Sequence, residues 1–488
     1  MTGHGFLPDP FIFSKVGVTA WDHPLYIVLG RLLVMAFPNA DSLWLVNLIS
    51  AIFGAASIVL VFQLCHRHTN SLLACGYAAL ALAVSHTFWW HSSTPEVYTL
   101  FIFLLLLSYS LFDDFESTRK TVHLFFASFF LGLAASNHIL AFLAFPSLVL
   151  YLVLSKGINL KGLDWQKIFL SVMGFTIGFS LYILQFLRIT RDFPLNELVG
   201  PIIGSTFLGG LSLSPPVFAE SLMKYLLFLV LQFGPLGILL GVVGMRVNKN
   251  KKIVSFYIVY MLFGVFYRVS DQFAFFLTSH VFFAILMGIG ASHLLKSLDK
   301  KPRLILTSIL PLSILLMPPF YRVLPSLAGN FGMDDVNFDI PKVGAGVRDG
   351  LVYYIDPYKR GDYDAYEFGA ETITSLPPNS IVIAEWYTDT DEYFVLRYFN
   401  TVKGVRPDVT ILGWMTIPPR SFDSQTVLNV VEENSPDRPV YLASLSDRFY
   451  ASSELIEMYC VVIENNLYRL YPEGEPGRPC LGVESATE

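Results

Sequence analysis

Apolar residues form runs along the first two thirds of the chain that are long enough, or nearly long enough, to cross a bilayer. A helix needs about 20 residues to span about 30 Å of hydrocarbon. We predict ten membrane helices, near residues 43–65, 72–88, 97–112, 122–136, 138–154, 168–187, 222–245, 253–268, 272–294 and 304–321. The pattern therefore predicts a polytopic α-helical membrane protein with a transmembrane domain over residues 43–321.

The pattern changes near residue 330, where charged residues return and apolar runs become short. Strands are predicted at "SIVIAE", "VTILG" and "PVYLAS", separated by helical stretches near 389–401 and 421–434. Alternating strands and helices predict an α/β domain over residues 330–488, with ligands near the carboxyl ends of the strands. We therefore expect acceptor-binding residues at that rim, namely Glu385, Trp386, Asp389 and Asp391.

Residues 1–42 precede the first long run and are predicted to form an exoplasmic loop and a juxtamembrane helix. The segment "PLYIVLGRLLVMAF" is too short to span and is expected to lie along the membrane surface. No signal peptide is predicted, because the first hydrophobic run comes late and lacks a cleavage pattern.

Composition supports this division and excludes several functions. The chain is 53% hydrophobic and 15% charged, whereas about a quarter of the residues of a soluble protein are charged. The net charge is −6 and no basic stripe is present, which argues against a nucleic-acid partner. No GxGxxG, P-loop, HExxH, paired CxxC or GxSxG motif occurs, so nucleotide-binding, zinc and serine-hydrolase functions have no support in the sequence. We expect neither a cofactor nor a metal.

The four cysteines fall into two pairs. Cys65 and Cys75 lie in or beside membrane helices and are interpreted as apolar fillers. Cys460 and Cys480 lie in the soluble domain and could form a disulfide if that domain faces an oxidising compartment.

The distribution of basic residues predicts the orientation. With the N-terminus outside, the cytoplasmic loops contain Arg67, Arg119, Lys120, Lys156, Lys161, Lys167, Arg246, Lys249, Lys251, Lys252, Lys296, Lys300, Lys301 and Arg303. The opposite side, up to residue 321, has only Lys15, Arg31, Arg188, Arg191, Lys224 and Arg268. The positive-inside rule then places the C-terminal domain on the non-cytoplasmic side, in the periplasm, at the cell exterior or in an ER lumen.

This orientation gathers the unusual polar residues on the non-cytoplasmic face. In "SSTPEVY", Ser93 and Glu96 have the spacing of a capping box, and Pro95 suits the first turn of a helix. The alternatives are an interfacial aromatic belt and a sugar-binding surface, because Trp89, Trp90, His91 and Tyr98 surround the carboxylate with aromatic groups.

Two further motifs carry the same kind of alternative. Asp22, followed by His23, is either the N-cap of the juxtamembrane helix or a general base beside the bilayer. Asn137 and His138 interrupt an apolar stretch, where they either satisfy backbone groups or line a site.

Two arginines and an aspartate lie at span ends on this face. Arg188, and Arg268 with Asp271, are either ordinary snorkelling or interfacial charges or, together, an anion site suited to a phosphate leaving group.

These motifs resemble those of a known family. The segments "HPLYIVLGRLL", "VNLISAIFGA", "SHTFWWHSSTPEVYTL", "LGLAASNHILAF", "SLYILQFLR", "SDQFAFFLTSHVFFAILMGIG" and "LPPNSIVIAEWYTDTDEYFVLRYFNTVKGVRPDV" occur in this order. They are similar to the protein O-mannosyltransferase-like proteins of the transmembrane protein 260 type, which belong to the GT-C superfamily of glycosyltransferases.

The resemblance implies an inverting enzyme, usually independent of metal. It would transfer a sugar, such as mannose, from a polyprenyl phosphate carrier to a hydroxyl of a protein or glycan at the non-cytoplasmic face. An acidic residue in the first exoplasmic loop is the expected base, and Glu96, Tyr98, His138, Arg188 and Asp271 are expected to line the site.

The N-terminal segment departs from the family pattern. The family has an acidic motif after a first membrane helix, whereas this chain begins at "MTGHGFLPDPFIFSKVGVTAWDHPLY". We expect a truncated start, with Asp9 or Asp22 as the alternative bases. A transporter of lipid-linked saccharide and a non-catalytic scaffold with a glycan-binding or partner-binding domain are the competing functions.

Overall fold

The computed structural model describes residues 23–155, 164–190, 209–269, 271–330, 347, 350–384, 392–413, 424–435, 437–445, 450, 452–472 and 480–481. Internal contacts divide this part of the chain into two units. The first contains the helices up to Leu327, together with Ile355–Tyr358, and the second contains the other described residues from Ala328 onward.

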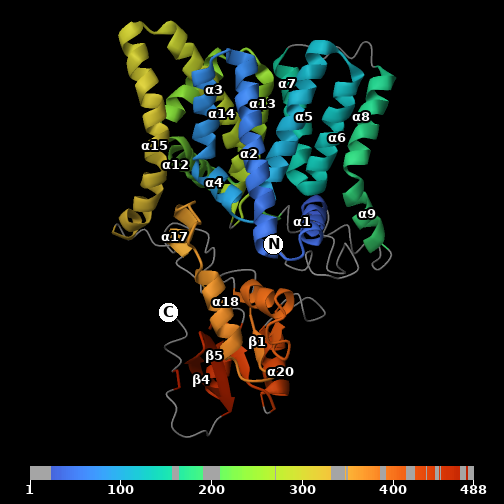
Figure 1. Cartoon of the computed structure of the whole chain (residues 1–488), viewed down its shortest axis with the longest axis vertical. Coiled ribbons are helices and arrows are strands. Elements are labelled where there is room, and N and C mark those ends of the chain that lie inside the picture. The colour runs from blue at the N-terminus through green and yellow to red at the C-terminus, as the bar shows by residue number, and fades with distance from the viewer. Residues whose placement is uncertain are drawn as a thin grey trace. The chain divides into compact units, whose positions relative to one another are not determined.

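The first unit consists of helices that run side by side (Figure 1). They are α1 (Pro24–Ala36), α2 (Ser42–Thr69), α3 (Leu72–Ala83), α4 (His86–Ser93), α5 (Tyr98–Thr118), α6 (Thr121–Asn137), the 3₁₀ helix η2 (Ile139–Leu143), α7 (Ala144–Leu154), α8 (Trp165–Gly178), α9 (Ser180–Ile189), α12 (Pro215–Val247), α13 (Lys251–Phe266), α14 (Gln272–Ser297) and α15 (Lys300–Asn330).

Every apolar run predicted from the sequence lies on one or two of these helices, but not every run forms a straight span. Among the described residues, α2, α5, α12, α14 and α15 are long and apolar enough to cross a membrane. Two further spans are possible if bent pairs count, namely α3 with α4, bent by 61°, and α8 with α9, bent by 58°. The structure thus supports five to seven spans by length and composition, and the number ten stays a prediction.

Helix α14 lies at the centre of the first unit. All of its residues from Gln272 to Ser292 are buried, and it contacts α2, α3, α12 and α13. The backbones of α12 and α14 approach closely at Gly244 and Gly290, where a side chain would collide with Leu286 O and Leu240 O of the facing helix. Small residues permit such close packing where the hydrophobic effect does not drive helices together.

Helix α12 is broken at Gly234, whose φ of 61° is open to glycine and strained for other residues. The next residue is Pro235, which has no N–H and cannot donate to the carbonyl of Leu231. The buried hydroxyl of Tyr321, from α15, donates to that carbonyl at 2.9 Å instead. The break is therefore compensated by a side chain of a neighbouring helix.

Side chains from the same two helices also bond the start of α4. The N–H of His86 donates to the Tyr321 hydroxyl at 3.0 Å, and the N–H of Thr87 donates to Gln232 Oε1 at 2.9 Å. Gln232 Nε2 donates in return to Thr87 Oγ1 at 2.7 Å. The first N–H groups of a helix have no partner within it, so these contacts allow α4 to begin inside the buried part of the unit.

The predicted cytoplasmic end contains a buried cation. Lys252, at the start of α13, is fully buried and forms ion pairs with Asp113 and Glu116 of α5. Its ammonium also lies over the rings of Tyr109, Phe112 and Tyr151. The sequence predicts that this lysine lies in a cytoplasmic loop. The structure shows instead that its buried ammonium, at the start of α13, contacts side chains of α5 and α7.

The second unit contains a five-stranded sheet with the strand order β2-β1-β3-β5-β4. Its strands are β1 (Ile381–Ile383), β2 (Thr410–Leu412), β3 (Val440–Leu442), β4 (Tyr459–Glu464) and β5 (Leu467–Pro472). The first three are parallel, and each lies within one of the predicted strand segments. Strand β5 pairs antiparallel with both β3 and β4.

Helices accompany this sheet in the second unit. They are α17 (Gly350–Ile355), α18 (Asp364–Ser375), α19 (Glu392–Arg397), the π-helix η3 (Tyr398–Val402), α20 (Ser424–Asn434) and α22 (Ser452–Met458). Apolar side chains of α18, α19 and η3 form one buried cluster with the sheet, and those of α20 and α22 form another.

The β4–β5 hairpin was missed in the sequence. Its turn consists of Asn465 and Asn466, which both have positive φ. Two-residue hairpin turns of this kind favour asparagine. The stretch "CVVIENNLYRLY" therefore contains a hairpin signal in its two asparagines.

The cysteines have two different environments. Cys460 and Cys480 form a disulfide, as the sequence interpretation allowed. Cys65 and Cys75 are buried and free, and they pack with Ala78 beside Phe62, as expected of apolar fillers.

Substituting Tyr321→Phe tests the role of its hydroxyl. We expect a loss of about 1–3 kcal/mol in the free energy of unfolding, because Leu231 O loses its buried donor and the N–H of His86 loses the Tyr321 hydroxyl as an acceptor. The measurement is the melting temperature of the detergent-solubilised protein. Tyr257→Phe is the matched control, since it removes only a contact of 3.4 Å to Tyr225. Equal melting temperatures for the two variants would contradict this role.

Candidate functional site

The loop between α4 and α5 is held by α2 at both of its ends. Asn47 Nδ2 donates to Ser93 O at 3.1 Å. The buried Ser50 hydroxyl accepts from the N–H of Glu96 and donates to Glu96 O, with both distances 2.9 Å. Tyr26 of α1 adds its hydroxyl 3.1 Å from Ser50 Oγ. The backbone of Glu96 is thus fixed by side chains, which leaves its carboxyl group for other contacts.

The predicted capping box is wrong. Helix α4 ends at Ser93, and α5 begins at Tyr98 with no side-chain cap. The physical reason is that Ser50 already supplies both a donor and an acceptor to the backbone of Glu96. Glu96 belongs to a loop and is only partly exposed.

A second break brings His138 close to this loop. Helix α6 ends at Asn137, whose Nδ2 donates to Val97 O at 2.9 Å. His138 has extended backbone, and its Nδ1 accepts from the N–H of Leu140 at 3.1 Å. The interpretation in which this polar pair satisfies backbone groups is therefore confirmed, and the Asn137 bond also holds the break against the start of α5.

His23 completes the group from the start of α1. Its Nδ1 lies 2.6 Å from Asn137 O, and its ring stacks on that of His138 with a centroid distance of 5.0 Å. Burial lowers the pKa of His23 to about 4, so the ring is neutral at pH 7. A carbonyl only accepts, so the single ring proton lies on Nδ1 and the lone pair on Nε2. His23 also occupies the N-cap position of α1, with no side-chain cap.

Aromatic rings continue from His138 to α4. Tyr98 lies 5.2 Å from His138 and 4.6 Å from His91, measured between ring centroids. His91 stacks on Phe273 of α14 at 5.4 Å. We call His23, Glu96, Tyr98, His138 and His91 the junction cluster, because they gather where four helix ends meet.

Charge at the junction cluster depends on Glu96 and Asp271. Asp271 occupies the N-cap position of α14, makes no side-chain cap and is exposed. Burial raises the pKa of Glu96 to about 7, and the negative charge of Asp271 raises it as well. Glu96 therefore titrates near neutral pH, which is typical of carboxyl groups at functional sites.

The predicted cations lie on different elements. Arg188 is on α9 and is half-buried. Arg268 follows α13 and forms a bidentate ion pair with Glu220, at 2.8 and 3.1 Å. The backbone N–H of Arg268 also donates to Gly210 O at 2.7 Å. The guanidinium of Arg268 thus faces a carboxylate in this structure, and an anion would have to compete with it.

Several predicted site residues lie outside the described residues. They are the proposed bases Asp9 and Asp22 and the proposed acceptor-binding residues Glu385, Trp386, Asp389 and Asp391. Within the part of the chain that the structure describes, no three metal-binding side chains come together. The roles assigned to these residues stay predictions.

Sequence reasoning missed the residues that hold the loop. Asn47 and Ser50 are three positions apart on α2 and therefore lie on one face of it. Polar residues on one face of an apolar helix indicate an internal contact. This spacing could have identified them.

Ser50→Ala tests how the Glu96 loop is held. We expect a loss of about 1–3 kcal/mol in the free energy of unfolding, because the buried bonds to the Glu96 backbone disappear. The melting temperature checks this. Ser57→Ala is the control on the same helix, since Ser57 bonds mainly within α2, to Phe53 O at 2.7 Å. An equal or smaller loss than in Ser57→Ala would contradict the anchoring role.

The titration of Glu96 predicts a pH dependence of stability. Because its pKa is raised from 4.5 to about 7, the folded state binds more protons than the unfolded state between these values. The contribution of Glu96 to the free energy of unfolding is therefore lost as the pH rises from 4.5 to about 7. The melting temperature of Glu96→Gln should fall less between pH 4.5 and 7.5 than that of the unchanged protein. The exposed Glu371→Gln is the control, and an equal pH slope in Glu96→Gln and the unchanged protein would disprove the assignment.

Part of the chain matches a known protein family in sequence. Residues 22–161 match the family model of the protein O-mannosyl-transferase TMEM260 N-terminal domain. No curated protein is similar enough in sequence to count as a match.

Among solved structures, two of ArnT from Cupriavidus metallidurans are similar to the whole chain. The one bound to undecaprenyl phosphate has a TM-score of 0.58 at 11% identity and covers 93% of this chain and 88% of that chain. The apo structure has the same TM-score and coverage at 13% identity. The resemblance expected from the sequence is confirmed to this extent: residues 22–161 match the TMEM260 N-terminal domain, and the fold of the chain is similar to that of ArnT.

Proposed function

We propose that the chain transfers a sugar, a hexose such as mannose, from a polyprenyl phosphate carrier to a hydroxyl group of a protein or glycan. The observation that carries this proposal is the junction cluster, whose five residues all lie within the matched residues 22–161. ArnT, whose fold the chain shares, was solved with undecaprenyl phosphate, and the matched domain is named for protein O-mannosyl transfer.

At the anomeric carbon the reaction forms one C–O bond and breaks another. The acceptor oxygen attacks the anomeric carbon, its proton passes to a base, and the bond from that carbon to the phosphate oxygen breaks with inversion. Asp22 is the proposed base and Asp9 the alternative. The leaving polyprenyl phosphate keeps the bonding electrons, and Arg188 and Arg268 are the proposed groups that stabilise its charge. The proposal includes no metal or other cofactor.

The junction cluster is suited to holding the sugar. The carboxyl of Glu96 can accept hydroxyl protons, and neutral His23 offers an acceptor nitrogen at Nε2. The rings of Tyr98 and His138 are buried and pack on each other, with a centroid distance of 5.2 Å, so they stabilise the cluster from inside the unit. The fixed backbone of Glu96 keeps this arrangement in place before the sugar binds, which reduces the ordering that binding requires.

We place this reaction on the non-cytoplasmic face. Basic residues gather in the opposite loops, which supports this orientation. The disulfide between Cys460 and Cys480 supports an oxidising compartment for the C-terminal unit, which means the periplasm, the cell exterior or an ER lumen.

A transfer assay tests the proposal. The full chain in lipid nanodiscs is incubated with polyprenyl phosphate mannose or glucose and with hydroxyl-bearing peptides or glycans, and the product is measured by mass spectrometry. We expect Asp22→Asn to lower kcat by about 10²–10⁴-fold, because the base is lost. Glu96→Gln should lower kcat/KM by about tenfold, the effect of losing about 1.4 kcal/mol of charged hydrogen bonding.

The control is Glu371→Gln, which changes an exposed carboxyl of α18. Normal transfer by Asp22→Asn and Glu96→Gln would contradict the assigned roles. Movement of the intact lipid-linked sugar across proteoliposomes, without any transfer, would show a transporter instead.

A further inference from the structure

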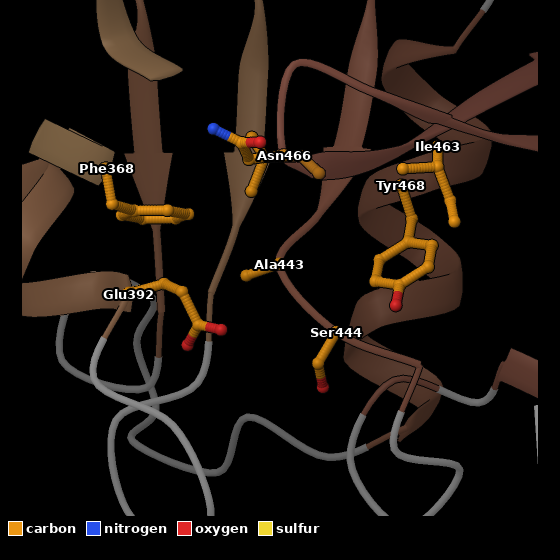
Figure 2. Close-up of a pocket in the computed structure, with 8 residues that line it drawn as sticks. Phe368, Glu392, Ala443, Ser444, Ile463, Asn466 and Tyr468 are labelled. Carbon is orange, nitrogen blue, oxygen red and sulfur yellow. The ribbon is translucent and has the colours of Figure 1, made fainter. Parts of the chain in front are cut away.

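The second unit has a pocket that the sequence analysis did not identify. Its volume is about 390 Å³, within the range of small-molecule sites. The side chains that matter to its chemistry are Phe368, Glu392, Ser444, Ile463, Asn466 and Tyr468. Figure 2 shows Phe368 and Glu392 on one side of the space, Ile463 and Tyr468 on the other, and Asn466 and Ala443 between them.

The fold places this pocket where α/β sheets often bind ligands. Ala443 and Ser444 directly follow β3, at the carboxyl end of a parallel strand. Ligands of such sheets bind outside the carboxyl ends of the strands. Glu392 begins α19 and is only 3% exposed, so its carboxyl is built into the pocket wall.

The β4–β5 hairpin supplies the other wall. Tyr468 lies opposite Leu442 of β3 and Ile463 of β4 in the sheet register. Asn466 occupies the hairpin turn with a φ of 64°, and its Nδ2 lies 3.3 Å from Thr372 Oγ1 of α18. The hairpin and α18 therefore hold the amide at the pocket.

The polar groups around this pocket both donate and accept hydrogen bonds. The carboxylate of Glu392 accepts, the amide of Asn466 does both, and so do the hydroxyls of Ser444 and Tyr468. Phe368 and Tyr468 add aromatic surface. An ammonium ligand only donates and would use only the acceptors among these groups, whereas an anion would be repelled by Glu392. Sugar hydroxyls match all of these groups, and the C–H face of a sugar packs on a ring.

We propose that this pocket binds an uncharged saccharide of one or two rings. This site is additional to the junction cluster and does not rest on sugar transfer. A saccharide bound here would be recognised by Glu392 and Asn466 through its hydroxyls and by Phe368 and Tyr468 through its ring faces.

Binding is measured without any lipid-linked donor, so the result is independent of the proposed transfer. The probes are methyl hexosides and disaccharides of mannose, glucose and galactose, titrated onto the full chain in nanodiscs and followed by saturation-transfer NMR. We expect Glu392→Gln and Asn466→Asp each to weaken binding of the best probe by about tenfold or more, equivalent to about 1.4 kcal/mol.

The matched controls make the same chemical changes outside the pocket. Asn465→Asp alters the neighbouring turn residue, which also has positive φ, and Glu371→Gln alters an exposed carboxyl of α18. Both should bind the probe as the unchanged protein does. If Glu392→Gln unfolds, the Asn466→Asp variant tests the proposal instead. Asn466 is exposed in the hairpin turn, so its substitution should leave the fold intact.

Three results would overturn the proposal. The first is that no saccharide of the panel binds, and the second is that binding is equally strong in Asn466→Asp and Asn465→Asp. The third is that methylammonium binds in a Glu392-dependent way while the saccharides do not, which would identify an amine site.

Discussion

Hydrocarbon offers no hydrogen-bond partners, so every backbone group that leaves a helix inside the membrane-spanning unit needs a partner from the protein. The helices of this unit are bent or interrupted at several places, and each interruption frees such groups. Tyr321 bonds both the carbonyl released by Pro235 and the start of α4. Ser50 does the same for the loop at Glu96. The packing of the other helices depends on these few side chains, because they bond the backbone groups that each break sets free. The breaks in turn bring the polar residues of the candidate site together.

The candidate site is a consequence of these breaks. Glu96 lies between α4 and α5, His138 between α6 and η2, and His23 at the start of α1. If these helices were unbroken, each residue would lie on the surface of its own helix, apart from the others. Because the breaks meet, His23 stacks on His138, and His138 contacts Tyr98 beside the Glu96 loop. The same low-dielectric surroundings raise the pKa of Glu96 toward 7 and lower that of His23 to about 4.

The two units use polar groups differently. In the first unit, buried polar side chains mostly bond backbone atoms, as Asn137 bonds Val97 and Gln232 bonds Thr87. In the second, Glu392 and Asn466 line a pocket at the end of a sheet. This difference follows from the architecture, since a sheet satisfies its own backbone along the strands and leaves side chains at its carboxyl edge for ligands.

The sequence by itself determined the helical membrane character and the three strands that pair in parallel, because burial in hydrocarbon requires long apolar runs and burial in a sheet requires short ones. The location of the polar residues on one face of the membrane stays a prediction. The sequence also contained the hairpin at Asn465 and Asn466 and the polar face of α2, although neither was recognised. Only the tertiary structure decided that Glu96 is a loop residue instead of a cap, that Lys252 is buried between two carboxylates, and that Arg268 faces Glu220. These outcomes depend on partners 46 to 139 residues away, and local spacing contains no information about such distant contacts.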